Sequence, residues 1–205
     1  MNTKTLKNPT AAAQGGGERL RLDESAIDAA KRSLEGGAVT PSYGPWREDI
    51  IQLLNDALAT EIVCTLRYKR HYFTAKGLAS PKIAEEFLVH ANEETAHGDM
   101  LAERIVQLGG EPDLNPEGLS TRSASEYVEG TTLLDMIRED LVAERVAVES
   151  YSEIVRYLGE DDPTSRRLME EILAKEEEHA DDLAKLLVRI GSAAKHGDGH
   201  PAHGH

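Results

Sequence analysis

Four segments of this chain carry apolar residues at the spacing of an amphipathic helix, and each apolar stripe is interrupted by residues that can ionise. The interrupting residues, in chain order, are Glu61, Glu94, His97, Glu144, Glu176 and His179. A carboxylate or imidazole on the buried face of a helix is costly unless it has a partner such as a metal ion. The pattern therefore predicts four packed helices whose polar side chains meet in the core.

The chain repeats this plan in two halves. Glu61 precedes Glu94 by 33 positions, and Glu144 precedes Glu176 by 32. The second helix of each half carries Glu-x-x-His, whose i, i+3 spacing places both side chains on one face, one turn apart. One such motif arises easily by chance in a glutamate-rich helix, whereas two motifs at matching offsets are specific. Four carboxylates and two imidazoles match the ligand set of a carboxylate-bridged di-metal centre.

Helix start and stop signals divide the chain into long helices. Ser80-Pro81 and Asp162-Pro163 each place an N-cap before a proline at the first helical position, and Gly109-Gly110 ends a helix. We predict helices over residues 46–75, 81–108, 131–158 and 163–190. The connection at 110–130 is longer than a helix hairpin needs and is long enough to cross the bundle. The fold class is therefore all-α: a four-helix bundle with a long crossover between its second and third helices.

The sequence outside the bundle is small and polar. We expect residues 1–45 to be a flexible extension that contains a short helix at 23–34, and residues 46–190 to be the bundle. Residues 191–205 are expected to be a flexible tail rich in glycine and histidine, because no further helix is predicted after Gly191. The sequence leaves open whether the tail histidines bind metal.

Composition excludes several classes of function. A net charge of −14 and a pI near 5.0 argue against a surface that binds nucleic acid, which needs clustered lysine and arginine. The single cysteine, Cys64, cannot form an intramolecular disulfide and suits a reducing compartment, so we expect a cytoplasmic location. Neither a signal peptide nor an apolar run of about 18 residues is present, and we expect no membrane association.

Residues 46–190 resemble the ferritin-like superfamily, and within it the bacterioferritins most closely. The resemblance rests on one motif in each predicted helix: LNDALATE ending at Glu61, EETAH ending at His97, LVAE ending at Glu144 and ILAKEEEH ending at His179. It implies a ferroxidase, in which two irons per subunit are oxidised from ferrous to ferric by oxygen or peroxide before the mineral is stored in a protein shell.

The resemblance also implies a role for each ligand. Glu61 and His97 would be terminal ligands of one iron, and Glu144 and His179 those of the other. Glu94 and Glu176 would bridge the two irons. Tyr68 matches a tyrosine of the family that lies near the metals and supplies a proton or electron, although a core aromatic residue is an equally good interpretation.

The sequence departs from the family pattern at three places. Thr95 stands where the family has its haem-ligating methionine, so we expect no bound haem. The family's inner-surface iron site uses a histidine and an aspartate, which Val89 and Glu93 replace here, with His90 beside them. The short fifth helix that lines the fourfold channels of large shells has no counterpart after Ile190. We therefore favour a homo-oligomeric shell of twelve subunits over one of twenty-four.

Three other functions stay open from the sequence alone. The first is a di-iron or di-manganese protein that destroys peroxide without storing iron, although no Cys-x-x-Cys motif is present for a rubredoxin-type iron. The second is a DNA-protecting mini-ferritin, a class that places its iron ligands across a subunit interface. The third is a bundle without metal, in which the buried acids and histidines only satisfy one another's hydrogen bonds.

Overall fold

The computed structural model describes residues 21–75 and 81–197, and this part of the chain contains helices and no strand. In order, the helices are α1 (Glu24–Arg32), α2 (Arg47–Ala75), α3 (Pro81–Gln107), the 3-10 turn η1 (Pro116–Gly118), α4 (Leu119–Arg122), α5 (Leu133–Leu158) and α6 (Pro163–Gly197). The predicted all-α fold is confirmed. The segment 1–17, Ser80 and the histidines from His200 onward lie outside the described residues.

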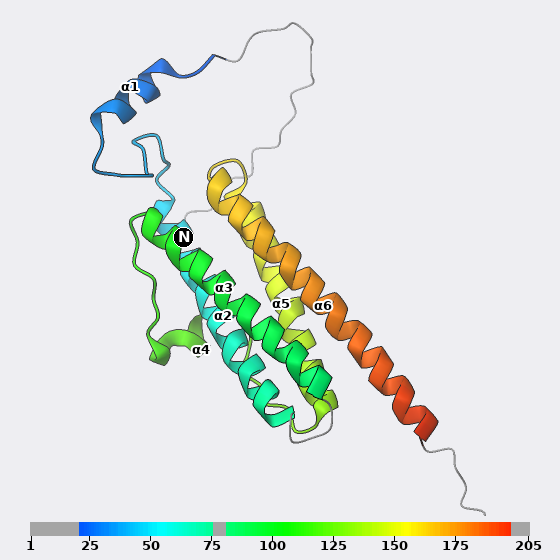
Figure 1. Cartoon of the computed structure of the whole chain (residues 1–205). Helices are drawn as coiled ribbons and strands as arrows, with labels where there is room; N and C mark the ends of the chain where they lie inside the picture. Colours follow the sequence, from blue (N-terminus) through cyan, green and yellow to red (C-terminus); the bar gives the residue numbers. More distant parts are fainter. Residues whose placement is uncertain (1–20, 76–80, 198–205) are drawn as a thin grey trace, which may run out of the picture.

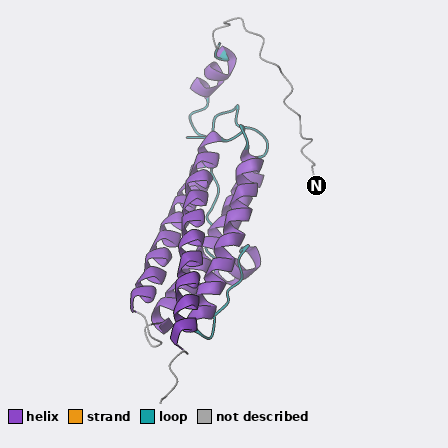
Figure 2. Cartoon of the chain, turned by 90° about the vertical axis from the view of Figure 1, so that its right-hand side faces the viewer, coloured by secondary structure: helices purple, strands orange, loops and turns teal. Residues whose placement is uncertain are grey.

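The four long helices form two antiparallel hairpins that pack side by side (Figures 1 and 2). Helix α2 pairs with α3, and α5 pairs with α6; α2 also borders α5, and α3 borders α6. The connection from α3 to α5 runs back along the bundle, so α2 and α5, the first helices of the two hairpins, start at opposite ends of the bundle (Figure 1). Helix α1 has no buried residues and lies beyond one end of the bundle.

The helix starts follow from local capping chemistry. Asp23 caps α1 by accepting hydrogen bonds from two backbone amides. Thr132 and Asp135 form a capping box at the start of α5, with both bonds 3.1 Å long. Asp162 accepts from the Ser165 amide at 2.9 Å and thereby starts α6. At the end of α3, Gly109 adopts a φ of 79°, which glycine tolerates without strain.

The end of the last helix differs from the prediction. We expected the helix to end near Ile190, but α6 continues to Gly197. Gly191 costs about 1 kcal/mol in a helix interior, but the Ala193, Ala194 and Lys195 that follow it are strong helix formers. The prediction gave the single glycine too much weight. These residues extend α6 rather than form a separate fifth helix.

The crossover is held against α2 by hydrogen bonds at successive turns of that helix. Asn55 accepts from the Asp113 amide at 2.7 Å, and Thr60 accepts from the Ala124 amide at 3.0 Å. Further along α2, Arg67 donates to the Glu126 carbonyl at 2.9 Å. A connection that is long and irregular is thus fixed along its length, because its backbone polar groups find partners on α2.

A buried ionic network joins α2 to α5 beneath the crossover. Asp140 accepts from Arg67 Nε at 2.9 Å and contacts His71 Nδ1 at 2.8 Å, and all three side chains are at most 1 % exposed. The other ring nitrogen of His71 lies 2.9 Å from the Glu129 carbonyl. His71 therefore lies between two oxygen atoms, and both carboxylate oxygens of Asp140 are engaged, one by Arg67 and the other by His71.

Apolar side chains fill the bundle on either side of its centre. One cluster includes Leu54, Leu58, Leu101, Ile105 and Ile172, and the other includes Phe87, Ile137 and Leu183. The polar residues predicted from the sequence lie between these two clusters. Within the part of the chain that is described, no helix is long and apolar enough to span a membrane.

Candidate metal centre

The six polar residues predicted to meet in the core do meet there. Each is between 0 and 6 % exposed. They comprise Glu61 on α2, Glu94 and His97 on α3, Glu144 on α5, and Glu176 and His179 on α6. Every helix of the bundle therefore contributes to one enclosed cluster, as the repeated sequence plan predicts.

One half of the cluster surrounds the Nδ1 atom of His97. This nitrogen lies 2.9 Å from Glu176 Oε1, 3.3 Å from Glu61 Oε2 and 3.6 Å from Glu94 Oε2. These four residues offer ligand atoms that all lie within 4.8 Å of one another. Three carboxylates and one imidazole at this spacing are a suitable set for a divalent first-row metal ion.

The other half surrounds the Nδ1 atom of His179. Its neighbours are Glu94 Oε1 at 3.4 Å, Glu176 Oε2 at 3.7 Å and Glu144 Oε2 at 3.9 Å. Glu94 and Glu176 therefore present one oxygen to each half. A carboxylate that faces two adjacent sites in this way has the geometry of a bridging ligand, whereas Glu61 and Glu144 each face one half.

Each of the six residues has one buried atom without a hydrogen-bond partner of acceptable geometry among the described residues. These atoms are Glu61 Oε2, Glu94 Oε1, His97 Nδ1, Glu144 Oε2, Glu176 Oε1 and His179 Nδ1. Buried polar atoms almost always find partners, since an unsatisfied one costs about 1–3 kcal/mol. His97 Nδ1 and Glu176 Oε1 lie 2.9 Å apart and can form an ion pair, but six buried ligand atoms that face one space without well-aligned hydrogen bonds fit a place for metal ions.

Two tyrosines donate hydrogen bonds to the two glutamates that each face only one half of the cluster. Tyr68 on α2 donates to Glu144 on α5, and Tyr151 on α5 donates to Glu61 on α2. Each tyrosine follows the glutamate of its own helix by seven positions, so the pair obeys the same internal repeat as the ligands. We singled out Tyr68 from the sequence and missed Tyr151. The repeat was the signal that could have identified it.

A further carboxylate orients His179. The Nε2 atom of His179 lies 2.8 Å from Glu93 Oε2, which leaves Nδ1 to face the cluster. An outer carboxylate that accepts from the second ring nitrogen is the usual way in which proteins fix the tautomer of a metal-binding histidine. Glu93, which the sequence placed at the family's inner-surface site, is therefore engaged here in holding His179.

Burial and mutual repulsion change the protonation of the cluster. Burial, together with the negative charge of the neighbouring glutamates, raises the pKa of Glu94 and that of Glu144 well above the usual range. Burial also acts to raise the pKa of Glu176, but the two imidazoles beside it outweigh burial and lower it. Burial opposes the charged form of His97, yet the adjacent carboxylates raise its pKa to about 10, and the pKa of His179 is raised for the same reason.

The fold and the core together define a four-helix-bundle protein with a carboxylate-rich centre. The chain belongs to the ferritin-like domain family, which matches residues 51–193. A bacterioferritin from Brucella melitensis is 32% identical over 148 residues, which cover 69% of this chain and 86% of that protein. A nutrient stress-induced DNA-binding protein from Synechococcus is 32% identical over 150 residues, covering 68% and 81% respectively. The resemblance inferred from the sequence is confirmed.

A solved structure supports the fold. A dodecameric thioferritin, the bacterioferritin-related protein from Bacteroides fragilis, superposes with a TM-score of 0.68 over 87% of this chain and all of that chain, at 24% identity. At this identity the likeness establishes the ferritin-like bundle and nothing finer.

The Tyr151 hydroxyl should matter for metal affinity. Tyr151→Phe removes the donor to Glu61 and frees that carboxylate to rotate, so we expect metal binding to weaken by about 10–100-fold, as for other outer-shell partners. Titration of the metal-free protein with Co²⁺ measures this effect. Tyr127→Phe, on the exposed crossover, is the matched control and should bind as the unchanged protein does. Equal affinities for both variants would contradict the assignment.

Proposed function

We propose that this protein is a ferroxidase that binds two ferrous ions within each subunit, oxidises them with oxygen or peroxide, and retains the ferric product in a homo-oligomeric shell. The observation that carries the proposal is the set of six unsatisfied buried atoms, arranged in two halves that share Glu94 and Glu176. Family membership supports the same conclusion. The iron is the substrate of this reaction as well as the ion bound.

The ligand set suits oxidation of iron. Glu61 and His97 would hold one ferrous ion, and Glu144 and His179 the other. Hard carboxylate oxygens favour ferric over ferrous iron, so a site with four carboxylates makes loss of an electron easier. The apolar clusters on both sides exclude bulk water from the centre. Manganese would accept the same ligands, and peroxide removal without storage is the alternative function for that metal.

Charge balance explains why the centre is stable both with and without metal. Without metal, the raised pKa values keep protons on Glu94, Glu144, His97 and His179. Two divalent ions bring four positive charges and would displace these four protons, so the buried charge stays constant. An enclosed core tolerates this exchange because it creates no unpaired charge.

We therefore predict that metal binding releases protons. At pH 7, addition of two equivalents of Co²⁺ to the metal-free protein should release up to about four protons per subunit, since each ligand must lose its proton to bind. The release is measured with a pH indicator in weak buffer. Affinity should fall as the pH falls, because protons then compete more strongly for the same atoms. Release of no protons would contradict the protonation pattern.

The stability of the metal-free protein should depend on pH in the opposite sense and fall as the pH rises. His97 has a pKa near 10 in the fold and about 6.5 in the unfolded chain, so its stabilising contribution is complete below about pH 6.5. That contribution is lost as the pH rises toward 10. Glu94 and Glu144, whose pKa values are also raised, act in the same direction.

Tyr68 is proposed to act on the proton balance at the centre. Its hydroxyl donates to Glu144 and lies 3.1 Å from His90 Nδ1, so it connects a terminal ligand to a buried histidine. Burial, followed by the negative charge of Glu144, raises the pKa of Tyr68 well above 10, which keeps the phenol protonated. A protonated phenol beside the ligands can supply a proton, or a proton together with an electron, during oxidation.

Storage requires a closed shell, and we propose one of twelve subunits in preference to twenty-four. A single bundle can oxidise iron but has no interior in which to keep mineral, so closure of a symmetric assembly is part of the function. The dodecameric relative supports the smaller shell. Our further reason, that no helix continues after Ile190, was wrong, because α6 runs to Gly197.

A DNA-protecting role is a weaker alternative. The similar Synechococcus protein is a DNA-binding protein by name. In this chain, however, all six candidate ligands lie within one subunit, and the net charge of −14 opposes contact with phosphates. Absence of a mobility shift with duplex DNA at 50 mM salt is the result we expect.

The proposed function is tested by adding ferrous iron to the metal-free protein in air. We expect oxidation faster than in buffer alone, oxygen or peroxide consumption in proportion to iron, and ferric iron that elutes with a large assembly on size exclusion. Iron that oxidises at the buffer rate would refute the ferroxidase. Rapid oxidation by a stable monomer or dimer would refute storage in a shell, but it would support the proposed oxidation of ferrous iron.

A further inference from the structure

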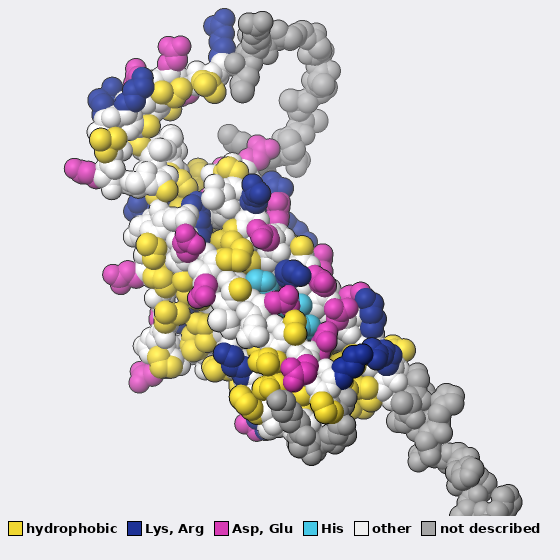
Figure 3. Space-filling view, in the orientation of Figure 1, with side chains coloured by type: hydrophobic (Ala, Val, Ile, Leu, Met, Phe, Trp, Pro, Cys, Tyr) yellow, Lys and Arg dark blue, Asp and Glu magenta, His cyan; other side chains and the backbone are white. Residues whose placement is uncertain are grey.

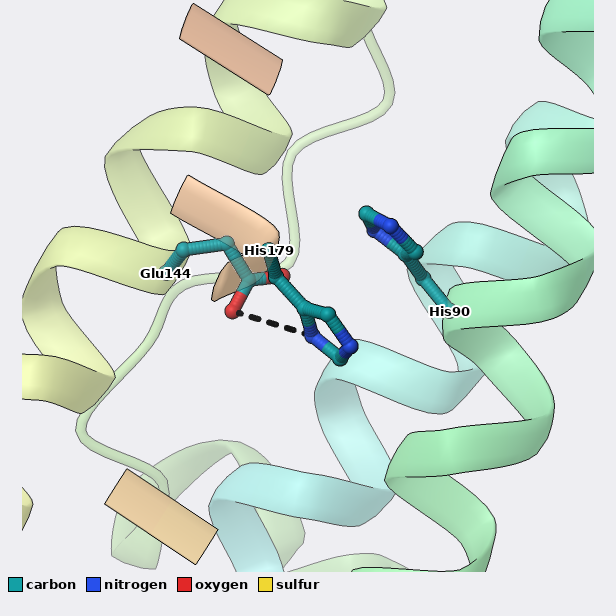
Figure 4. Close-up of side chains that lie close together, drawn as sticks. All are labelled: His90, Glu144 and His179. Atoms are coloured by element: carbon teal, nitrogen blue, oxygen red, sulfur yellow. Dashed lines mark ion pairs between the residues drawn. The ribbon is translucent and has the colours of Figure 1, made fainter. Parts of the chain in front are cut away.

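One buried histidine near the centre is not among the six candidate ligands. His90 is 2 % exposed on α3, and its ring stacks on that of His179, with centroids 4.1 Å apart. Figure 4 shows His90 facing His179 and Glu144 from the neighbouring helix. These three residues offer ligand atoms within 4.8 Å of one another. His90 thus lies directly beside one half of the candidate metal centre.

His90 also belongs to a second group of ligand atoms that faces away from the centre. Glu86, one turn earlier on α3, and Asp182, one turn after His179 on α6, complete this group, again with all atoms within 4.8 Å. Both acids are less buried than His90 and line a groove of about 400 Å³ between α3 and α6. On this face of the molecule, small parts of histidine side chains are visible between acidic and basic ones (Figure 3).

Hydrogen bonding selects which nitrogen of His90 can bind a cation. Once Glu144 has lost its proton to bind metal, the Tyr68 hydroxyl donates its only proton to this carboxylate, so toward His90 it can act only as an acceptor. His90 Nδ1, which lies 3.1 Å from this hydroxyl, must then carry the ring proton. In the neutral imidazole the lone pair is therefore on Nε2. A metal-binding histidine held in this way by its second nitrogen is ready to act as a ligand.

We propose that Glu86, His90 and Asp182 form a third divalent-cation site, which takes cations from the groove and passes them to the di-metal centre. Two carboxylates and one imidazole are a suitable partial ligand set for such an ion. His90 is common to the outer group and to the group with Glu144 and His179, so a cation can move inward by exchanging ligands step by step. The transfer rests on the proposed function, whereas binding at the outer site does not.

Basic residues limit the affinity of this site. Lys82, Lys185 and Arg189 line the same groove. The Lys185 ammonium lies 2.5 Å from Asp181 Oδ2 and 3.3 Å from Asp182 Oδ1, so it competes with a cation for Asp182. Weak binding suits a site through which ions pass. Removal of this competitor by Lys185→Gln should tighten cation binding at the outer site by about thirtyfold, the effect of one unit charge on a divalent ion near 4 Å in a water-like medium.

The binding test compares Co²⁺ stoichiometry by equilibrium dialysis on full-length, metal-free protein. Glu86→Gln/Asp182→Asn should bind one ion fewer per subunit than the unchanged protein. Glu85→Gln/Glu177→Gln removes two exposed carboxylates from the same helices and should lose none. Because the histidine-rich tail is common to all variants, any ions that it binds cancel in the comparison. Equal stoichiometry in both double variants would overturn the third site.

The transfer test uses the rate of ferrous oxidation in stopped flow at limiting iron. We expect Glu86→Gln/Asp182→Asn to slow the reaction by about tenfold, because the groove then loses both carboxylates that attract the cation and keeps its three basic residues. The ion count at the di-metal centre should be unchanged. Loss of one ion with no change in rate would overturn the transfer and keep the site. If the unchanged protein did not oxidise ferrous iron, the proposed function would be refuted. The outer site would still stand if the Glu86→Gln/Asp182→Asn variant bound one Co²⁺ ion fewer.

Discussion

Replacing Glu94 with alanine should abolish the di-metal centre while leaving the bundle folded. Glu94 presents Oε2 to His97 at 3.6 Å and Oε1 to His179 at 3.4 Å, so its loss removes a ligand from both halves at once. Removing only an outer-shell partner of a metal ligand typically costs about 10–100-fold. For a bridging ligand we expect ferrous oxidation to fall by at least about 100-fold and both ions to be lost.

The fold should tolerate this substitution because of the protonation of the metal-free centre. Burial raises the pKa of Glu94, so alanine replaces a neutral carboxylic acid and leaves no buried charge without its partner. Circular dichroism and urea unfolding of the metal-free protein should therefore change little. Glu103→Ala, on the exposed face of the same helix, is the control and should keep both activity and stoichiometry. Unchanged metal content in Glu94→Ala would refute the site.

The second large effect is on stability. Asp140→Asn keeps the size of the side chain but leaves the Arg67 guanidinium buried without a counter-ion. Breaking a buried ion pair by removing one partner costs about 3–5 kcal/mol, because the remaining charge stays out of water. We expect the free energy of unfolding of the metal-free protein to fall by about that amount, measured in urea at fixed protein concentration.

A matched control is an exposed ion pair of the same chemistry. Arg166 Nε lies 2.7 Å from Glu170 on the surface of α6, with both side chains more than 40% exposed. Glu170→Gln should cost less than about 1 kcal/mol, since water solvates the arginine that remains. Equal losses in the free energy of unfolding for Asp140→Asn and Glu170→Gln would contradict the claim that the buried Arg67–Asp140 ion pair stabilises the fold.

The sequence predicted the bundle and its candidate ligands because both depend on local periodicity. Apolar spacing shows which face of a helix is buried, and Glu61 or Glu176 on that face is conspicuous without any knowledge of the partner helix. Caps at Thr132 and Asp162 act over three or four residues, so helix starts were also predictable. The end at Gly197 was not, since a single glycine only weakens a helix.

Contacts between distant segments could not be predicted in this way. Arg67 and Asp140 are 73 positions apart, and nothing in either helix specifies that the two will meet. The link from Tyr151 to Glu61 spans 90 positions and was visible only through the internal repeat. The role proposed for His90 depends on the partner to which Tyr68 donates its proton, which is a property of the packed core and not of the spacing along α3.

The central claim is that two metal ions lie side by side within each subunit and share Glu94 and Glu176. Anomalous diffraction from crystals soaked anaerobically in Fe²⁺, collected on both sides of the iron edge, tests it most directly. We predict two adjacent iron peaks in every bundle, one beside Glu61 and His97 and the other beside Glu144 and His179. A single peak among these residues, or iron bound only elsewhere on the subunit, would contradict the account.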